Sequence, residues 1–381
     1  MTEMTSARVK RLRLAQNLSQ LELAEQSGVA SGAISMIESG AIDVPESAIA
    51  AIARALDCEP KYLERPSSGT VSTRPLLRAY ADAPKRAVDA IEADNGVAID
   101  AAKYLGLTLV ANVLDHTGLP LFEGDLNDEI EIEQFALQVR TSAGLAPESV
   151  VGNSMRTAER LGCVVLPIDS AMGRHLGVSM RTDDVAVIRV SRPSHVSGLS
   201  IPGDRQRFTV AHELGHLVLH HSTEQPRNPA QAAKVEREAN RFASAFLVPG
   251  DPVLQDLSAL GGKVTLTTLS KLKEKWGFAI KAFVIRFEQL GVIDDDHARS
   301  LYKQISARKW NKSEPVLVGN ESAVWMARAI GKKYGSGPAG LSAAAREVGI
   351  SSSYFERWTD WSPAAAPENV IDFAAVKASR G

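Results

Sequence analysis

The sequence predicts a multidomain chain that is mainly α-helical, with an all-helical head and one small mixed α/β domain. Its 381 residues exceed what one small hydrophobic core organises. Apolar residues recur at helical spacing along most of the chain. Between Ser154 and Arg192 the spacing changes to short apolar runs bounded by turn residues, which is typical of strands.

The order of these patterns divides the chain. Pro, Ser, Gly and Thr cluster in ERPSSGTVSTRP, which predicts a linker, and the last twenty residues are expected to be poorly ordered. The expected parts are a helical head (1–66), a linker (67–75), a helical connector (76–122), the mixed α/β domain (123–290), a helical C-terminal region (291–361) and a disordered tail (362–381).

Composition narrows the functional class. Hydrophobic residues make up 44% and charged residues 23%, as in an ordinary globular protein. The net charge of -2 gives no global basic field, so any DNA contact must come from a local patch. No stretch approaches the roughly 18 apolar residues of a membrane span, and the N-terminus lacks the apolar core of a signal peptide. We therefore expect a cytoplasmic protein. Cys58 and Cys163 are expected to be buried thiols rather than a disulfide or a metal pair.

The mixed domain is expected to hold three strands followed by two helices. The strands are CVVLPI, GVSM and VAVIRVS, and the helices are RFTVAHELGHLVLHH and AAKVEREANRFASAFL. We expect the strand around Val185 to Val190 at the edge of the sheet, where a substrate would add as an extra strand.

The strongest chemical pattern is His212-Glu213-Leu214-Gly215-His216. Histidines four residues apart project from one side of a helix, which suits two positions of a tetrahedral zinc. Glu213 lies beside that side, where it can take a proton from an attacking water. The alternative is a pair of core histidines satisfied by hydrogen bonds. Because the helix is apolar nearly all round, the metal interpretation is favoured.

A catalytic zinc requires a third protein ligand, and the next helix offers EREAN. Glu236 and Asn240 are four apart and share one side of that helix. This spacing is similar to the Glu-x-x-x-Asp arrangement of glutamate-zincins, in which the first residue binds zinc and the last orients a histidine. We therefore prefer Glu236 as ligand with Asn240 behind it, Glu238 being the alternative ligand and solvated helix charges the simpler interpretation. His220 continues the histidine side, but at about 12 Å from His212 it is too far to complete the same metal site. We expect a surface histidine, the alternative being a residue that binds substrate or orients a ligand.

RQRFTVAHELGHLVLH and the later VEREANRFASAFLVP resemble the ImmA/IrrE family of zinc metallopeptidases, and the similarity covers roughly residues 125 to 315. The resemblance implies a zincin-like domain with one Zn²⁺ per chain, His212 and His216 as ligands, Glu213 as general base and a glutamate of EREAN as third ligand. Family members with a helix-turn-helix regulate stress responses, mobile elements or metabolism, and some cleave a repressor.

The head resembles the Xre/Cro-repressor helix-turn-helix family over residues 9 to 63. In LSQLELAEQSGVASGAISMIESG, Ser19 and Glu22 form a capping box and Gly28 makes the turn. Gln20 matches a phosphate-contacting position of that family. Other phosphate contacts are expected from the basic cluster around Arg11 and Arg13.

The recognition helix gives a weaker signal. Ser31, Gly32, Ser35 and Met36 occupy its outward positions, and none carries the donor fork of Arg, Asn or Gln. Residues 1–66 hold seven Lys/Arg against nine Asp/Glu. A head retained for protein contact or dimerisation is therefore the alternative to operator DNA binding.

The C-terminal segment LSAAAREVGISSSYFERW repeats the spacing of the first motif over residues 341–358. It predicts either a second helix-turn-helix or a helical hairpin with a glycine turn, and we favour the hairpin.

Taken together, these patterns predict a DNA-binding regulator fused to a zinc endopeptidase that cleaves a protein such as a repressor. The alternative is a non-proteolytic repressor or antitoxin that uses the peptidase fold to bind a partner such as a toxin. The sequence leaves homodimer formation open.

Overall fold

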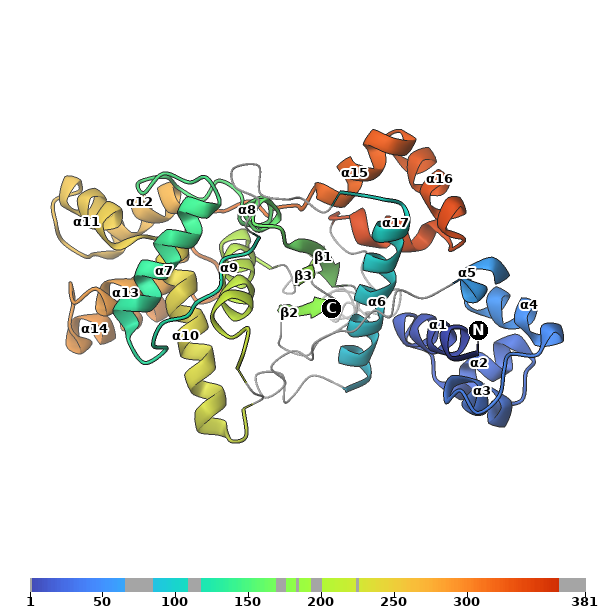
Figure 1. Cartoon of the computed structure of the whole chain (residues 1–381). Helices are drawn as coiled ribbons and strands as arrows, with labels where there is room; N and C mark the ends of the chain where they lie inside the picture. Colours follow the sequence, from blue (N-terminus) through green and yellow to red (C-terminus); the bar gives the residue numbers. More distant parts are fainter. Residues whose placement is uncertain are drawn as a thin grey trace, which may run out of the picture.

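The structure is a computed structural model, shown in Figure 1. It describes residues 2–65, 85–108, 118–168, 176–182, 185–192, 201–223 and 226–362. The expected linker (67–75) and all but the first residue of the expected tail (362–381) lie outside the described residues. The helical content with one small sheet confirms the predicted fold class.

The head consists of short helices around its own apolar side chains. Its helices are α1 (Thr2–Ala15), α2 (Gln20–Ser27), α3 (Ser31–Glu38), α4 (Glu46–Ala55) and α5 (Pro60–Glu64). Ser19 caps α2 with the predicted capping box, and Gly28 adopts a left-handed φ of 69° that ends the helix. That backbone conformation is the reason the turn to α3 needs glycine.

The sheet has the strand order β1-β3-β2. β1 (Val164–Ile168) runs parallel to β3 (Val185–Ser191), and β2 (Gly177–Thr182) runs antiparallel to β3. The prediction that the Val185–Val190 strand lies at the edge is wrong, because that strand hydrogen-bonds to a neighbour on each side. The edge strand of the described sheet that packs beside the histidine helix is β2.

Both faces of this sheet are covered. Ala186, Ile188 and Val190 of β3 point into the core of the larger domain, whereas Val185 and Val187 point to the core that contains the head. Alternate residues of a strand face opposite sides, so the sheet lies between the two cores and contributes side chains to both.

The larger domain packs helices on the first face of the sheet (Figure 1). Those next to the sheet and site are α7 (Glu129–Ser142), α8 (Ser154–Arg160), α9 (Gly203–Leu219) and α10 (Pro229–Leu247). Those further along the chain are α11 (Gly250–Ala259), α12 (Leu266–Trp276), α13 (Ile280–Gln289) and α14 (Asp295–Ala307). Within this core, α9 packs against β2, β3, α8 and α10.

The second face is covered by α6 (Lys85–Tyr104) and the C-terminal helices, and the head packs against α6. The C-terminal helices, called here the C-terminal unit, are α15 (Trp325–Tyr334), α16 (Pro338–Val348) and α17 (Ser352–Thr359). Figure 1 shows this unit and the head on one side of the molecule and α10 to α14 on the other. The expected C-terminal region is thus divided, because α14 joins the large core and α15 to α17 join the core of the head.

Two further expectations concern the cysteines and the absence of a membrane-spanning helix. Both cysteines are free thiols, Cys163 being buried and Cys58 half-buried. In the described part of the chain, every helix is too short or too polar to cross a bilayer.

Candidate metal centre

The centre is built on α9, whose apolar residues fix the helix against the core. Val210, Ala211 and Leu214 are at most 1% exposed, so the helix has one rotational setting. His212 and His216 then lie one turn apart, with ring centroids 4.6 Å from each other. The two rings meet edge to face, and their Nε2 atoms are 3.0 Å apart.

Glu236 of α10 completes a triad with these histidines. Its Oε2 is 3.4 Å from His212 Nε2, and its Oε1 is 3.4 Å from His216 Nε2. Zinc–ligand bonds of about 2.0–2.1 Å in a tetrahedron separate the ligand atoms by about 3.3–3.4 Å. The two 3.4 Å distances involve different oxygens of Glu236, and one atom from each of the three residues can be chosen so that all lie within 4.8 Å of one another, a spacing in which a single metal ion can be bound. The Glu236 side chain is 34% exposed, so the triad is open to solvent at this residue.

Each histidine is oriented from behind by a further side chain. His212 Nδ1 is 3.0 Å from Asn240 Oδ1, so the amide oxygen accepts the ring proton and leaves Nε2 open. His216 Nδ1 is 3.1 Å from His220 Nδ1, and His220 Nε2 is 2.9 Å from Glu238 Oε2. With Glu238 ionised, His220 donates to the carboxylate and accepts from His216, which leaves His216 Nε2 open as well.

This arrangement changes two expectations. His220 is 4% exposed, so the prediction of a surface histidine is wrong. It follows the last turn of α9, where the backbone brings its ring back against His216. Glu238 points to His220 rather than to the paired Nε2 atoms, and it lies outside the triad of His212, His216 and Glu236.

The electrostatics of the triad suit a cation. Burial lowers the pKa of His216 to about 4, which keeps its ring neutral. Burial would raise the pKa of the Glu236 carboxyl, but its hydrogen bonds to His212 and His216 outweigh burial and hold that pKa below its ordinary value. At His212 the hydrogen bond to Glu236 and the charges of Glu213 and Glu236 outweigh burial and raise the pKa of the ring. His216 and Glu236 are thus in the protonation state that metal binding requires, whereas His212 would release a proton to a bound cation.

Glu213 lies on the other side of the histidines, next to β2. It is 3% exposed, and its Oε2 accepts a hydrogen bond of 2.7 Å from Ser179 Oγ of the edge strand. Gly177 makes this approach possible, since a Cβ there would meet Glu213 atoms at 2.9 Å. No sequence pattern indicates Ser179 as a site residue, because its role depends on how β2 lies against α9.

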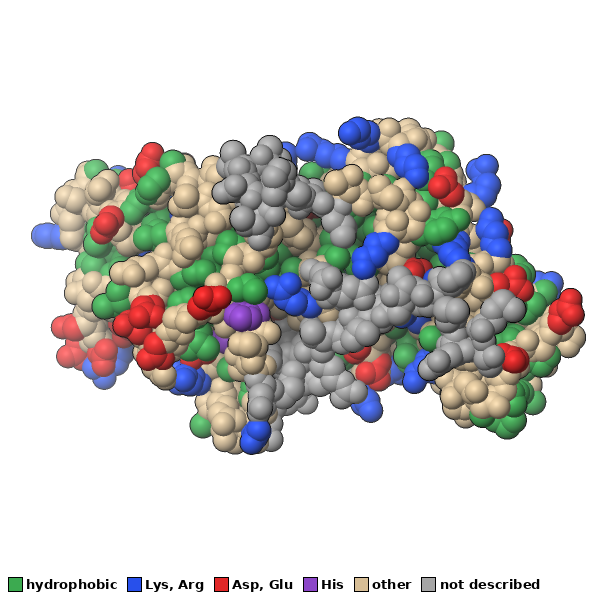
Figure 2. Space-filling model, in the orientation of Figure 1, with side chains coloured by type: hydrophobic (Ala, Val, Ile, Leu, Met, Phe, Trp, Pro, Cys, Tyr) green, Lys and Arg blue, Asp and Glu red, His purple; other side chains and the backbone are tan. Residues whose placement is uncertain are grey.

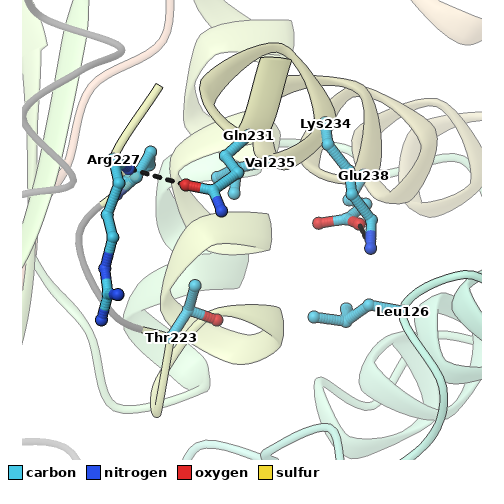
Figure 3. A pocket seen from close by; sticks show the side chains of 8 residues that line it. Leu126, Thr223, Arg227, Gln231, Lys234, Val235 and Glu238 are labelled. Atoms are coloured by element: carbon cyan, nitrogen blue, oxygen red, sulfur yellow. Dashed lines mark hydrogen bonds and ion pairs between the residues drawn. The ribbon is translucent and has the colours of Figure 1, made fainter. Parts of the chain in front are cut away.

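A cavity of about 430 Å³ opens behind this network (Figure 3). Leu126, Arg227, Gln231, Lys234 and Glu238 are among its lining residues, and Lys234 Nζ is 3.6 Å from Glu238 Oε1. Glu238 therefore stands between His220 and the cavity, with its second oxygen toward Lys234.

The candidate DNA-contacting residues of the head differ in how accessible they are. Ser31, Gly32, Ser35 and Met36 are exposed on α3, as a recognition helix requires. Gln20 Nε2 donates to Glu38 Oε2 at 2.9 Å.

The two predicted arginines of α1 are turned inward. Arg13 is 7% exposed and forms an ion pair of 2.5 Å with Glu38. Arg11 packs its side chain along Gly96 of α6, where a Cβ would meet its Cδ at 3.1 Å. These positions remove Arg13 from the expected phosphate contacts and direct Arg11 toward α6.

The segment 341–358 forms two helices joined by Gly349 in the left-handed conformation. Its second helix, α17, buries Tyr354, Phe355 and Trp358 and packs on β1. Two helices joined by a left-handed glycine fit both predicted forms, a helical hairpin and a second helix-turn-helix.

The head and the larger domain together define a class of protein, a helix-turn-helix regulator joined to a peptidase-type domain. Residues 9–63 match the family described as Helix-turn-helix, and residues 158–288 match a peptidase family described as the IrrE N-terminal-like domain. The chain therefore carries an IrrE N-terminal-like domain behind an Xre-type head, and the resemblance seen in the sequence is confirmed. No curated protein and no solved structure matches the chain.

Proposed function

We propose that the chain is a DNA-binding regulator whose IrrE N-terminal-like domain is a zinc-dependent endopeptidase acting on a protein substrate. The observation that carries the proposal is the triad of His212, His216 and Glu236, whose metal-binding atoms all lie within 4.8 Å of one another, with three protein ligands as in a catalytic zinc site. The proposed content is one zinc per chain.

The chemistry that zinc supplies when bound is Lewis-acid polarisation of a carbonyl oxygen and acidification of water. Glu213 is the proposed general base. It is buried next to His212 in the chain and is not one of the three proposed ligands, so its carboxylate would remain available to accept a proton. It would accept a proton from the attacking water and pass it to the leaving amine. Ser179 would hold the Glu213 carboxylate in place through its hydroxyl hydrogen bond.

The proposed substrate is an extended segment of a protein, such as a repressor. The outer side of β2 is the edge of the described sheet closest to Glu213. A peptide that adds to this edge as a further strand would place its backbone carbonyls along the base and the triad. The edge strand assigned here is β2 rather than the strand expected from sequence.

Glu213→Gln tests this proposal against a purely binding role. The variant should keep zinc and the fold while losing hydrolysis of the target by about 10²–10⁴-fold, since general-base catalysis supplies that much. The measurements are zinc content, circular dichroism and restoration of the regulatory response in cells that lack the gene. A zinc-loaded Glu213→Gln protein with full regulatory effect would refute proteolysis and leave the antitoxin or repressor role.

A further inference from the structure

The outward face of α2 and α3 lacks the charges that DNA requires. Residues 14 to 53 contain no Lys or Arg, but they contain five acidic residues: Glu22, Glu25, Glu38, Asp43 and Glu46. Phosphate neutralisation by Lys and Arg supplies essentially all non-specific DNA affinity. This face can contact bases through small side chains, but it cannot anchor a phosphate backbone electrostatically.

The arginines of α1 do not replace these charges. Arg8 forms a buried ion pair of 2.8 Å with Asp100 of α6, and Arg13 pairs with Glu38. Both guanidinium groups are at most 9% exposed. Their charge is used to fix the head to the rest of the molecule and to close its own core.

On α1 to α4 the exposed cations are Lys10 and Arg54, whereas α15 and α16 of the C-terminal unit carry four. α15 and α16 carry Arg328, Lys332, Lys333 and Arg346 against the single acidic residue Glu347, a net charge of +3. All four basic side chains are exposed, and Arg328 and Lys332 are four residues apart on one side of α15. Figure 2 shows Lys and Arg side chains grouped over this part of the molecule.

This basic surface is fixed to the head by backbone contacts. Glu59 N donates to Gly349 O at 2.8 Å, and Ser351 N donates to Asp57 O at 3.0 Å, which forms a short antiparallel bridge. Lys61 of α5 adds its charge there, since its Nζ donates to Arg346 O at 3.3 Å. The head and the C-terminal unit also share one apolar core, so the cations keep a constant position relative to α3.

We propose that the C-terminal unit is a second nucleic-acid-binding element, in which Arg328, Lys332 and Arg346 hold the phosphate backbone of duplex DNA. The proposal rests on the DNA-binding part of the proposed function and assigns its electrostatic component to α15 and α16. The head then contributes contacts from α3 that are neutral and depend on base sequence or groove shape.

The test uses the full chain and a fluorescently labelled duplex of mixed sequence, so no operator needs to be known. Anisotropy titrations over a series of KCl concentrations compare wild type with the triple variant Arg328→Ala, Lys332→Ala, Arg346→Ala. We expect the triple variant to bind at least about tenfold more weakly. A plot of log affinity against log salt has a negative slope, and its magnitude should decrease by about three in the triple variant. Each substitution removes one cation that neutralises a phosphate.

A matched control removes the same charge from the opposite end of the molecule. Lys263, Lys271 and Lys312 are exposed, and they lie within or next to α12 and α14, far from α15 and α16 (Figure 1). Their triple Ala variant should bind like wild type. Circular dichroism and melting curves establish that both variants fold.

The outcomes separate this inference from the proposed function. Equal decreases in affinity for the two triple variants, or no decrease in either, would refute a phosphate surface on the C-terminal unit while leaving DNA binding intact. Wild type that fails to bind duplex DNA even at low salt would refute DNA binding by this chain and the inference with it.

Discussion

Replacing Glu238 by Gln should weaken zinc binding although Glu238 is outside the proposed ligand set. The carboxylate accepts from His220 Nε2 at 2.9 Å, and His220 in turn accepts from His216 Nδ1 at 3.1 Å. The negative charge therefore fixes the protons of both rings so that His216 Nε2 faces the metal. Glutamine keeps the size of the side chain but removes this charge.

The magnitude follows from the kind of hydrogen bond that is changed. A bond to a charged group contributes about 1.5–3 kcal/mol and a neutral one about 0.5–1.5 kcal/mol, so the substitution loses roughly 1–1.5 kcal/mol. Since about 1.4 kcal/mol is a factor of ten in affinity, zinc should bind about tenfold more weakly. This is the lower end of the 10–100-fold range known for residues that orient metal ligands.

Three consecutive residues of α10 provide the assay with internal controls. Zinc affinity is measured by competition with a chromophoric chelator for Glu236→Gln, Arg237→Gln and Glu238→Gln. Glu236→Gln should lose most affinity because it removes a ligand, Glu238→Gln should lose about tenfold, and exposed Arg237 should tolerate its change. An affinity for Glu238→Gln equal to that of Arg237→Gln would refute the orienting chain, and a larger loss than for Glu236→Gln would move the ligand to Glu238.

Three other predictions concern metal content and stability. The double variant His212→Ala, His216→Ala should purify without zinc, and unchanged metal content by elemental analysis would exclude the site. Burial disfavours the Asp94 carboxylate, but the charges of Arg189 and Arg357 outweigh burial and hold its pKa below the ordinary value of 3.8. Asp94→Asn should therefore destabilise the fold by about 3–5 kcal/mol near neutral pH. Denaturation should show that the difference in unfolding free energy between wild type and Asp94→Asn becomes smaller as the pH falls below 3.8. A difference that is constant or increases on acidification would contradict the ion-pair argument. Because the head packs on α6, and α6 packs on the sheet of the larger domain, calorimetry should give one unfolding transition whose van't Hoff and calorimetric enthalpies agree. Two separate transitions would contradict this coupling.

The sequence predicted those features that depend on residues close together along the chain. The histidines of α9 share a helix turn, and the capping box of Ser19 and Glu22 lies within one turn of α2. The three strands were also predicted, since each is a short apolar run. In all these cases the signal lies within a few consecutive residues, as apolar periodicity or as a capping motif.

Features that depend on packing between distant segments were predicted less well. The order of the strands was wrong for β3, because an apolar run does not show which neighbours it pairs with. Ser179 reaches Glu213 only because β2 crosses beside α9. Arg13 looked like a phosphate contact because its acidic partner Glu38 lies 25 residues further along the chain.

The alternation along β2 shows how one strand links the two halves of the molecule. Val178 and Met180 pack against Ile91 and its neighbours on α6, whereas Ser179 between them turns to the opposite face and hydrogen-bonds to Glu213. A shift of one residue in the pairing of β2 with β3 would place an apolar side chain at the base and a hydroxyl against α6. The packing of α6 therefore fixes the register that holds the proposed base. α1 lies along α6 and is tied to it by Arg8 and Asp100, so the same contacts that attach the head also position the edge strand beside Glu213.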